Sequence, residues 1–199
     1  CYVCKTDYRE VHFFYHFLCP QCAQFNYGMR GLRADLRGRK AMVTGGRVKI
    51  GHQLVLRLLR DGAEVLVTTR FPHAAARRFD EEPDSAEWSD RLRIFGLDLR
   101  NIPAVEAFAA HLLEQESSLD ILVHNAAQTI QRPPGFYHEL LAQEARPQET
   151  LSLNAQRMVV ASPGLAGALE SPAQLLALAG ALPDILPLDK LHEIGRAHV

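Results

Sequence analysis

Short apolar runs and helix-spaced apolar positions alternate along the middle of the chain. Residues 41–44 (AMVT) and 64–69 (EVLVTT) read as strands, and the second run has three consecutive apolar residues, as is typical of a strand covered on both faces. Between these runs, apolar residues recur at i, i+4, i+8 and i+9 from Ile50, which predicts a helix over 50–60. Asp61-Gly62 would end that helix.

The same alternation continues further along the chain. It predicts a helix over 73–80, an acidic surface loop over 81–90, a third strand with its exit over 91–99, a helix over 103–115, and a fourth strand leading into a turn over 119–127. Strands and helices joined in this order by short turns predict an α/β fold, namely a Rossmann-like doubly wound parallel sheet with right-handed crossovers.

Ligands of such sheets bind at the carboxyl ends of the strands. The predicted strand ends carry Thr44-Gly45, Arg70, Asp98-Leu99 and Asn125-Ala126. Because these ends meet at one edge of a parallel sheet, we expect the four pieces to form one site.

The pattern weakens after Arg132. Pro133-Pro134-Gly135 interrupts the chain, and short helices are expected over 151–162 and 172–182. We therefore divide the chain into four parts, which are a cysteine module over 1–28, a basic linker over 29–39, an incomplete α/β domain over 40–193 and a tail over 194–199.

All four cysteines lie in the first 22 residues, as the pairs Cys1-x-x-Cys4 and Cys19-x-x-Cys22. Two such pairs can present four thiolates to one tetrahedral Zn²⁺, and a shell closed by four sulfurs is typical of a structural site. The 14-residue gap between the pairs is just under the usual spacing. Two disulfides or a redox CxxC are the alternatives, and disulfides would require an oxidising compartment.

Histidines and aromatic residues fill the gap between the cysteine pairs. His12 and His16 are read as bystanders, because four cysteines already complete a zinc shell. Phe13, Phe14, Tyr15 and Phe17 are expected to pack a small core around the metal, since so short a segment needs one to hold it.

Composition narrows the choice of partners. The chain has 199 residues, a formal net charge of -1, 47% hydrophobic and 23% charged residues, which is the profile of a globular protein. We expect a cytoplasmic protein that binds neither nucleic acid nor a membrane, and we leave a homo-oligomer open.

The turn after the first strand, Thr44 to Gly51, reads TGGRVKIG. Glycines let a backbone approach a pyrophosphate closely, and the N-terminus of the following helix favours the negative charge. Gly46 and Gly51 have the spacing of a mononucleotide P-loop, but His52-Gln53 follows in place of Lys-Ser or Lys-Thr. A nucleoside triphosphate site is therefore not expected.

This turn resembles that of the short-chain dehydrogenase/reductase family, T-G-x-x-x-G-x-G, with Thr44, Gly45 and Gly51 matching and Lys49 in place of the middle glycine. His124-Asn125-Ala126-Ala127 is similar to the family's N-N-A-G, and Asp98 corresponds to its acidic residue near the adenine. The resemblance covers residues 40–128 and implies a nicotinamide dinucleotide cofactor and a small carbonyl or alcohol substrate.

The resemblance also defines the expected cofactor residues, which are Thr44, Gly45, Gly46, Arg47, Lys49, Ile50, Gly51, Arg70, Asp98, Leu99, Asn125 and Ala126. An NAD site places an acid at the end of the second strand, and an NADP site places an arginine nearby. Thr69 and Arg70 stand at that point, and Arg47 and Lys49 add positive charge. NADP(H) is therefore the expected cofactor, since an arginine can bind a 2′-phosphate bidentately.

The family's catalytic Tyr-x-x-x-Lys is not present in the chain. Tyr137 is the only tyrosine after the fourth strand, and its fourth follower is Leu141. Asn125 is the only residue of the family's active region that carries over, in a supporting role.

The last residues, Ile194 to Val199, would be encoded by ATC GGA AGA GCA CAC GTC, which reads like a sequencing adapter. We expect a natural chain that continues beyond about Leu191 and contains the catalytic pair. The alternative is a non-catalytic dinucleotide-binding module with a zinc knuckle for protein interaction.

Overall fold

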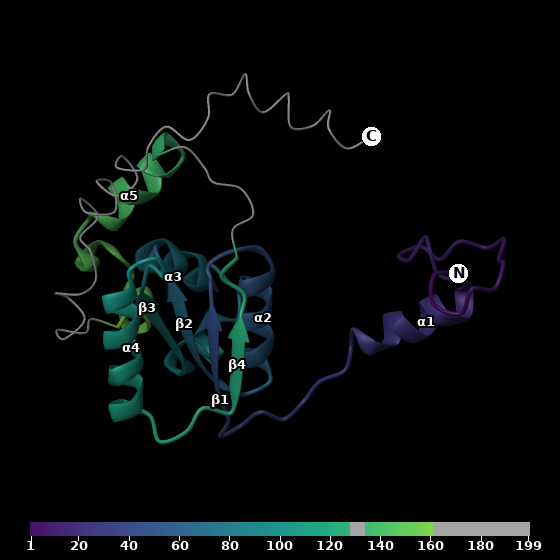
Figure 1. Cartoon of the computed structure of the whole chain (residues 1–199), viewed down its shortest axis with the longest axis horizontal. Coiled ribbons are helices and arrows are strands. Elements are labelled where there is room, and N and C mark those ends of the chain that lie inside the picture. The colour runs from purple at the N-terminus through teal and green to yellow at the C-terminus, as the bar shows by residue number, and fades with distance from the viewer. Residues whose placement is uncertain (128–133, 161–199) are drawn as a thin grey trace. The chain divides into compact units, whose positions relative to one another are not determined.

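The structure is a computed structural model that describes residues 1–127 and 134–160 (Figure 1). It divides into two compact units, Cys1–Asp35 and Leu36–Val199, which we call unit 1 and unit 2. The expected helix over 172–182 and the expected tail over 194–199 lie outside the described residues.

Unit 1 is a cysteine-bearing loop followed by one helix, α1 (Pro20–Met29). Pro20 opens the helix directly after Cys19, at a position where proline's missing N–H costs nothing. The sequence did not predict α1, because Ala23, Phe25 and Tyr27 alternate with polar residues at a period of two.

The expected aromatic core of unit 1 is wrong. Phe13 and Phe14 are exposed, and Phe17 is 79% exposed. Phe13 and Phe14 both contact the ring of Tyr27, and 4.4 Å separates the His12 and Phe13 centroids. Leu18 and Ala23 are the buried hydrophobic residues of this unit. A segment of this length has too little volume to enclose several large rings.

Unit 2 is built on a parallel sheet, as predicted. Its strands are β1 (Lys40–Thr44), β2 (Glu64–Thr69), β3 (Leu92–Gly96) and β4 (Ile121–His124), in the spatial order β3-β2-β1-β4. β1 pairs in parallel with both β2 and β4, and β2 pairs in parallel with β3. The Rossmann-like α/β prediction is confirmed.

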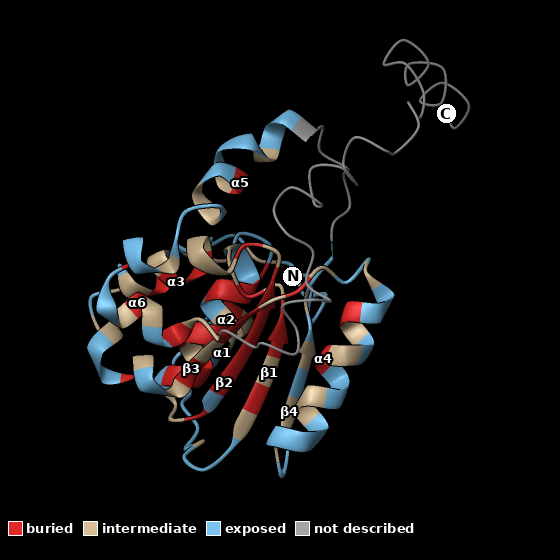
Figure 2. Ribbon diagram, turned by 90° about the vertical axis from the view of Figure 1, so that its left-hand side faces the viewer, coloured by how far each residue is buried: buried red, intermediate tan, exposed pale blue. Residues whose placement is uncertain are grey.

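Helices cover both faces of this sheet (Figure 2). The main helices are α2 (Lys49–Arg60), α3 (Pro72–Asp80), α4 (Ile102–Gln115), α5 (His138–Glu144) and α6 (Leu153–Met158). Short 3-10 turns lie between them, at η1 (Ser85–Glu87), η2 (Ser89–Arg91), η3 (Pro134–Tyr137) and η4 (Gln148–Thr150). The buried residues of α2, α3 and α6 share one core with the strands, whereas α4 packs with Leu66 and Phe95 on the other face.

Two details of the predicted pattern are wrong. Ile50 is 76% exposed, and Val55 and Leu56 take the buried positions of α2 together with Leu58 and Leu59. Ile50 lies in the first turn of α2, outside the buried side of the helix. The acidic loop is not wholly on the surface, because Trp88 is buried and packs edge-on against Phe79 at 6.2 Å.

The helix expected over 151–162 is shorter than predicted. α6 ends at Met158, and Val159 is extended and forms a parallel bridge with Ile94 on the outer edge of β3. Met158 is buried in the main core, so this segment closes the α3 side of the sheet. Among the described residues, no helix is both long enough and apolar enough to cross a membrane.

Candidate functional site

The carboxyl ends of the four strands lie together at one edge of the sheet. The register pairs Thr44 with both Thr68 and His124, and Thr69 with Gly96. The glycine turn, Arg70, Asp98 and Asn125 each follow one of these ends. The edge therefore brings together the pieces of the predicted cofactor site.

The glycines of the turn are required by close packing. A Cβ on Gly46 would lie 2.7 Å from Val67 Cγ1, and one on Gly51 would lie 2.3 Å from the carbonyl oxygen of Gly45. Gly45 has a φ of +71°, and a Cβ there would lie 2.9 Å from Ala126 Cα. The turn is therefore pressed against β2 and the end of β4, and no side chain fits at these three positions.

Lys49 takes the backbone conformation of a glycine. Its φ is +54°, in the left-handed region that L-residues rarely adopt. The turn thus keeps its path although the middle glycine is replaced, at a cost of about 1 kcal/mol or more. Lys49 and Ile50 are exposed at the start of α2, where a ligand can reach them.

Asn125 ties the end of β4 to the glycine turn. Its Nδ2 donates to the carbonyl oxygens of Thr44 (3.3 Å) and Gly45 (3.1 Å). The backbone N–H groups of Asn125 and Ala126 donate to Thr44 Oγ1, at 3.0 and 3.1 Å. These bonds fix the turn from one side, in keeping with a supporting role for Asn125.

Two arginines gather around Phe71, at the end of β2. Arg47 Cζ lies 5.2 Å and Arg70 Cζ 5.3 Å from the centroid of this buried ring. The Thr69 hydroxyl accepts a hydrogen bond from Phe71 N at 3.2 Å and so helps to place the ring. Burial lowers the pKa of Arg47, and the positive charges of Arg78 and Arg70 lower it further. Cations held this close repel one another, and a bound anion would relieve that repulsion.

Asp98 is engaged by its own neighbour. Arg100 Nη2 lies 2.5 Å from Asp98 Oδ2, and the Arg100 backbone N–H donates to Oδ1 at 3.0 Å. Burial raises the pKa of Asp98, but the hydrogen bonds from Arg100 outweigh it and leave the pKa below its usual value. Asp98 therefore remains ionised at the site, beside the exposed Leu99.

The sequence did not single out Phe71, Arg78 or Glu144. Phe71 directly follows Arg70, and this adjacency was the one available signal for it. Arg78 lies on α3, and its electrostatic contact with Arg47 depends on how α3 packs. Glu144 reaches α3 from α5, about 70 residues along the chain, and no local pattern indicates such a contact.

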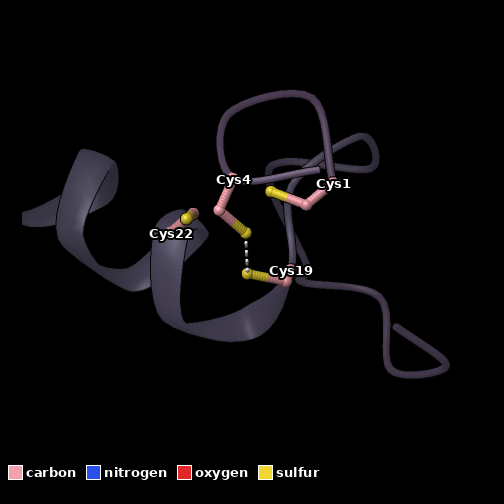
Figure 3. A group of neighbouring side chains, drawn as sticks. All are labelled: Cys1, Cys4, Cys19 and Cys22. Atoms are coloured by element: carbon pink, nitrogen blue, oxygen red, sulfur yellow. Dashed lines mark hydrogen bonds between the residues drawn. The ribbon is translucent and has the colours of Figure 1, made fainter. Parts of the chain in front are cut away.

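The four cysteines of unit 1 come together as predicted (Figure 3). Their sulfurs all lie within 4.8 Å of one another, and Cys4 Sγ and Cys19 Sγ are 3.7 Å apart. All four are free thiols rather than disulfides. Tetrahedral zinc with bonds of about 2.3 Å separates its sulfurs by about 3.8 Å, so the cluster fits that ion.

The thiols of this cluster also perturb one another. Hydrogen bonds from Thr6 lower the pKa of Cys4 to about 6, whereas hydrogen bonding with Cys19 raises the pKa of Cys22 to about 11. The group thus resists carrying four negative charges unless a cation shares them. His12 Nδ1 accepts hydrogen bonds from Phe14 N and Tyr15 N, at 3.1 and 3.2 Å, and so shapes the loop.

Comparison with known proteins identifies a family for most of unit 2. The profile of the family described as short chain dehydrogenase matches residues 39–172. The uncharacterized protein R665 of Acanthamoeba polyphaga mimivirus is 40% identical over 136 residues, which are 65% of this chain and 29% of that protein.

Two further relatives have names that state a family or an activity. Dehydrogenase/reductase SDR family member 13 of Bos taurus is 42% identical over 98 residues, 49% of this chain and 25% of that protein. Human retinol dehydrogenase 13 is 32% identical over 97 residues, 47% of this chain and 28% of that protein. The chain thus spans less than a third of the length of each of these three relatives.

Proposed function

Because the chain belongs to the short-chain dehydrogenase family, we propose that unit 2 binds NADP(H) at the carboxyl edge of its sheet. The glycine turn would hold the pyrophosphate at the N-terminus of α2. The protein of which this unit is a part would be an oxidoreductase that reduces a small carbonyl compound or oxidises an alcohol.

The convergence of Arg47 and Arg70 on Phe71 carries this proposal. Both side chains lie at the end of β2, where a dinucleotide of this fold places its adenosine ribose. Thr69 stands there in place of the acid that would bind a free 2′-hydroxyl. A 2′-phosphate would offset the repulsion between the cations, whereas the 2′-hydroxyl of NAD(H) would not.

Lys49 adds to the same preference. Its exposed side chain is the second positive charge of the turn, after Arg47. Its φ is +54°, a conformation that a glycine would adopt without strain. We infer that the strain is kept because the charge is useful at this position.

Turnover needs residues that these 199 positions do not hold. The sequence contains no Tyr-x-x-x-Lys, so the general acid and its lysine would come from another part of the protein. The chain's own residues would bind and orient the dinucleotide, which supplies or accepts the hydride when bound. The second candidate is a module that binds the dinucleotide without turnover.

We also propose a structural Zn²⁺ in unit 1. Cys1, Cys4, Cys19 and Cys22 would hold it, and four sulfurs leave no open position for catalysis. The exposed rings around the cluster offer little other stabilisation, so the metal would hold the loop to α1.

The decisive experiment is calorimetric titration of NADPH and NADH into the full chain and into Arg70→Ala. Charge-assisted hydrogen bonds are worth about 1.5–3 kcal/mol, so the variant should lose roughly tenfold to a hundredfold in NADPH affinity. NADH affinity should change little, because the missing guanidinium has no 2′-phosphate to bind.

Arg39→Ala is the matched control. Arg39 lies at the amino end of β1, where its Nη1 is 2.8 Å from Asp120 Oδ1. Its substitution should leave both affinities unchanged. Equal losses of NADPH and NADH affinity in Arg70→Ala would contradict the NADP assignment. Activity of the whole protein with NADPH would decide between turnover and binding alone.

A further inference from the structure

One aromatic side chain at the candidate site comes from a distant segment. Tyr137 ends η3, and its ring centroid lies 4.8 Å from Arg70 Cζ and 5.6 Å from the Phe71 ring, at an interplanar angle of 29°. Arg70 Cζ and the Phe71 centroid are 5.3 Å apart, so the three groups form a closed triangle of contacts. All three separations are typical of cation–π and aromatic pairs.

The segment that carries Tyr137 is anchored on α3. Glu144, the last residue of α5, accepts hydrogen bonds from His73 N at 2.9 Å and from Ala74 N at 2.7 Å. These are N–H groups of the first turn of α3, and its N-cap residue Phe71 supplies no side-chain acceptor. Leu141, one turn earlier in α5, is buried.

This anchoring changes what can bind an anion beside β2. The N-terminus of a helix after a strand would ordinarily be a favourable place for a phosphate. The Glu144 carboxylate already takes that place on α3, and its negative charge faces Arg47. Recognition of a phosphate at this corner therefore falls to arginine side chains, whose orientation then matters more.

We propose that Tyr137 is a positioning residue that holds Arg70 for a 2′-phosphate, with Glu144 docking its segment on α3. This inference rests on the proposed NADP(H) site. An arginine side chain loses rotamer entropy when a ligand fixes it. Because two rings already restrict Arg70 in the free protein, less entropy is lost when the ligand binds. Tyr137 would thus set the preference for phosphorylated ribose while taking no part in the chemistry.

The test uses two small probes that differ in one phosphate, adenosine 2′,5′-bisphosphate and adenosine 5′-monophosphate. Both would be titrated into the full chain, Tyr137→Leu and Tyr137→Phe, and the ratio of the two dissociation constants compared. The wild type should prefer the bisphosphate by at least tenfold. Tyr137→Leu should reduce that ratio about fivefold, because the cation–π contact is lost.

Tyr137→Phe keeps the ring and should retain the wild-type ratio of dissociation constants. An unfolded variant would not retain that ratio. Tyr27→Leu, which replaces a tyrosine outside unit 2, is the control and should change neither dissociation constant. Fluorescence of Trp88, which is buried in unit 2, reports whether unit 2 of each variant remains folded. If Tyr137→Leu melts early, Tyr137→Met provides a second aliphatic variant.

The two failures are distinguishable. A wild type that binds both probes equally would overturn the NADP(H) proposal and this inference with it. A wild type that prefers the bisphosphate, together with a folded Tyr137→Leu that keeps the full preference, would overturn the role of Tyr137 alone.

Discussion

Unit 1 and unit 2 differ in what stabilises each of them internally. In unit 1, Leu18 and Ala23 are the buried hydrophobic residues, and the four cysteine sulfurs lie within 4.8 Å of one another. In unit 2, a continuous core runs from the strands through α2 and α3 to Trp88 and Met158. Unit 1 has by far the higher share of Phe, Trp and Tyr, eight in 35 positions against seven in 164 for unit 2, so a lack of large apolar rings does not explain its small core.

What differs is whether a surface exists for a ring to be buried against. A parallel sheet with helices on both faces presents two such surfaces, whereas a short loop and one helix present none. Unit 1 would therefore depend on its metal, and unit 2 on apolar burial. The chain offers separate reporters, since its single tryptophan lies in unit 2 and four of its five tyrosines, at 2, 8, 15 and 27, lie in unit 1.

The largest expected effect is the loss of unit 1 when its metal site is broken. Zinc binding by small domains is worth about 10–16 kcal/mol, far more than Leu18 and Ala23 can contribute. Cys19→Ser, or a chelator added to the wild type, should abolish the zinc content and the near-ultraviolet signal of the tyrosines. Thermal unfolding followed by Trp88 should stay where it was.

His16→Ser is the matched control for the cysteine variant. His16 lies in the same loop, outside the sulfur cluster, and its removal should leave one zinc per chain. Zinc lost equally from His16→Ser and Cys19→Ser would contradict a shell of four sulfurs. A Trp88 transition that falls with chelation would contradict the independence of the two units.

The next effect compares the same substitution in the two units. Phe79→Ala should cost unit 2 about 3–5 kcal/mol, because Phe79 is fully buried between His52 and Trp88. Phe25→Ala, at a ring that is 64% exposed in unit 1, should change stability by no more than about 0.5 kcal/mol. Chemical denaturation followed by Trp88 and by tyrosine ellipticity measures both.

A cost at Phe25 as large as that at Phe79 would mean that unit 1 buries its rings against something, such as a partner. Equal and small costs would mean that the core of unit 2 is loosely packed. Either result would remove the contrast on which the comparison rests.

The same contrast explains how far the sequence could be interpreted. The strands of unit 2 were predictable because covered strands leave runs such as Val65-Leu66-Val67, and the cysteine cluster because the spacing of its ligands is local. Ile50 and Phe17 were misjudged because an apolar residue is buried only where a surface faces it. The role of Glu144 could not be predicted, since its partners are about 70 residues away.

Within the candidate site, the division is similar. The sequence alone predicts a tight turn from Gly45, Gly46 and Gly51. The structure shows which atoms a side chain at each of these positions would clash with. The grouping of Arg47 with Arg70 around Phe71 requires the packing of α2, β2 and α3 together. The meeting of the four strand ends at one edge was predictable from the parallel sheet, whereas the contacts with Phe71 and Glu144 were not.

The smallest expected effect is that of an ion pair on the surface of unit 2, which neither a metal nor the apolar core stabilises. Arg60 donates to both carboxylate oxygens of Asp84, at 2.6 and 2.7 Å, and these bonds lower the pKa of Asp84 to about 2. A lowered pKa stabilises the folded state at pH values above the ordinary pKa of 3.8, and this stabilisation is lost as the pH falls through about 2.

Asp84→Asn should therefore cost less than about 1 kcal/mol at pH 7, because the pair is partly exposed and Glu82 also contacts Arg60 at 3.2 Å. In urea denaturation followed by Trp88, the difference from wild type should shrink towards zero near pH 2, while the exposed control Asp90→Asn should differ little at any pH. A difference that persists unchanged at pH 2 would show that Asp84 acts through packing rather than charge, and the surface of unit 2 would then have to be counted with its core.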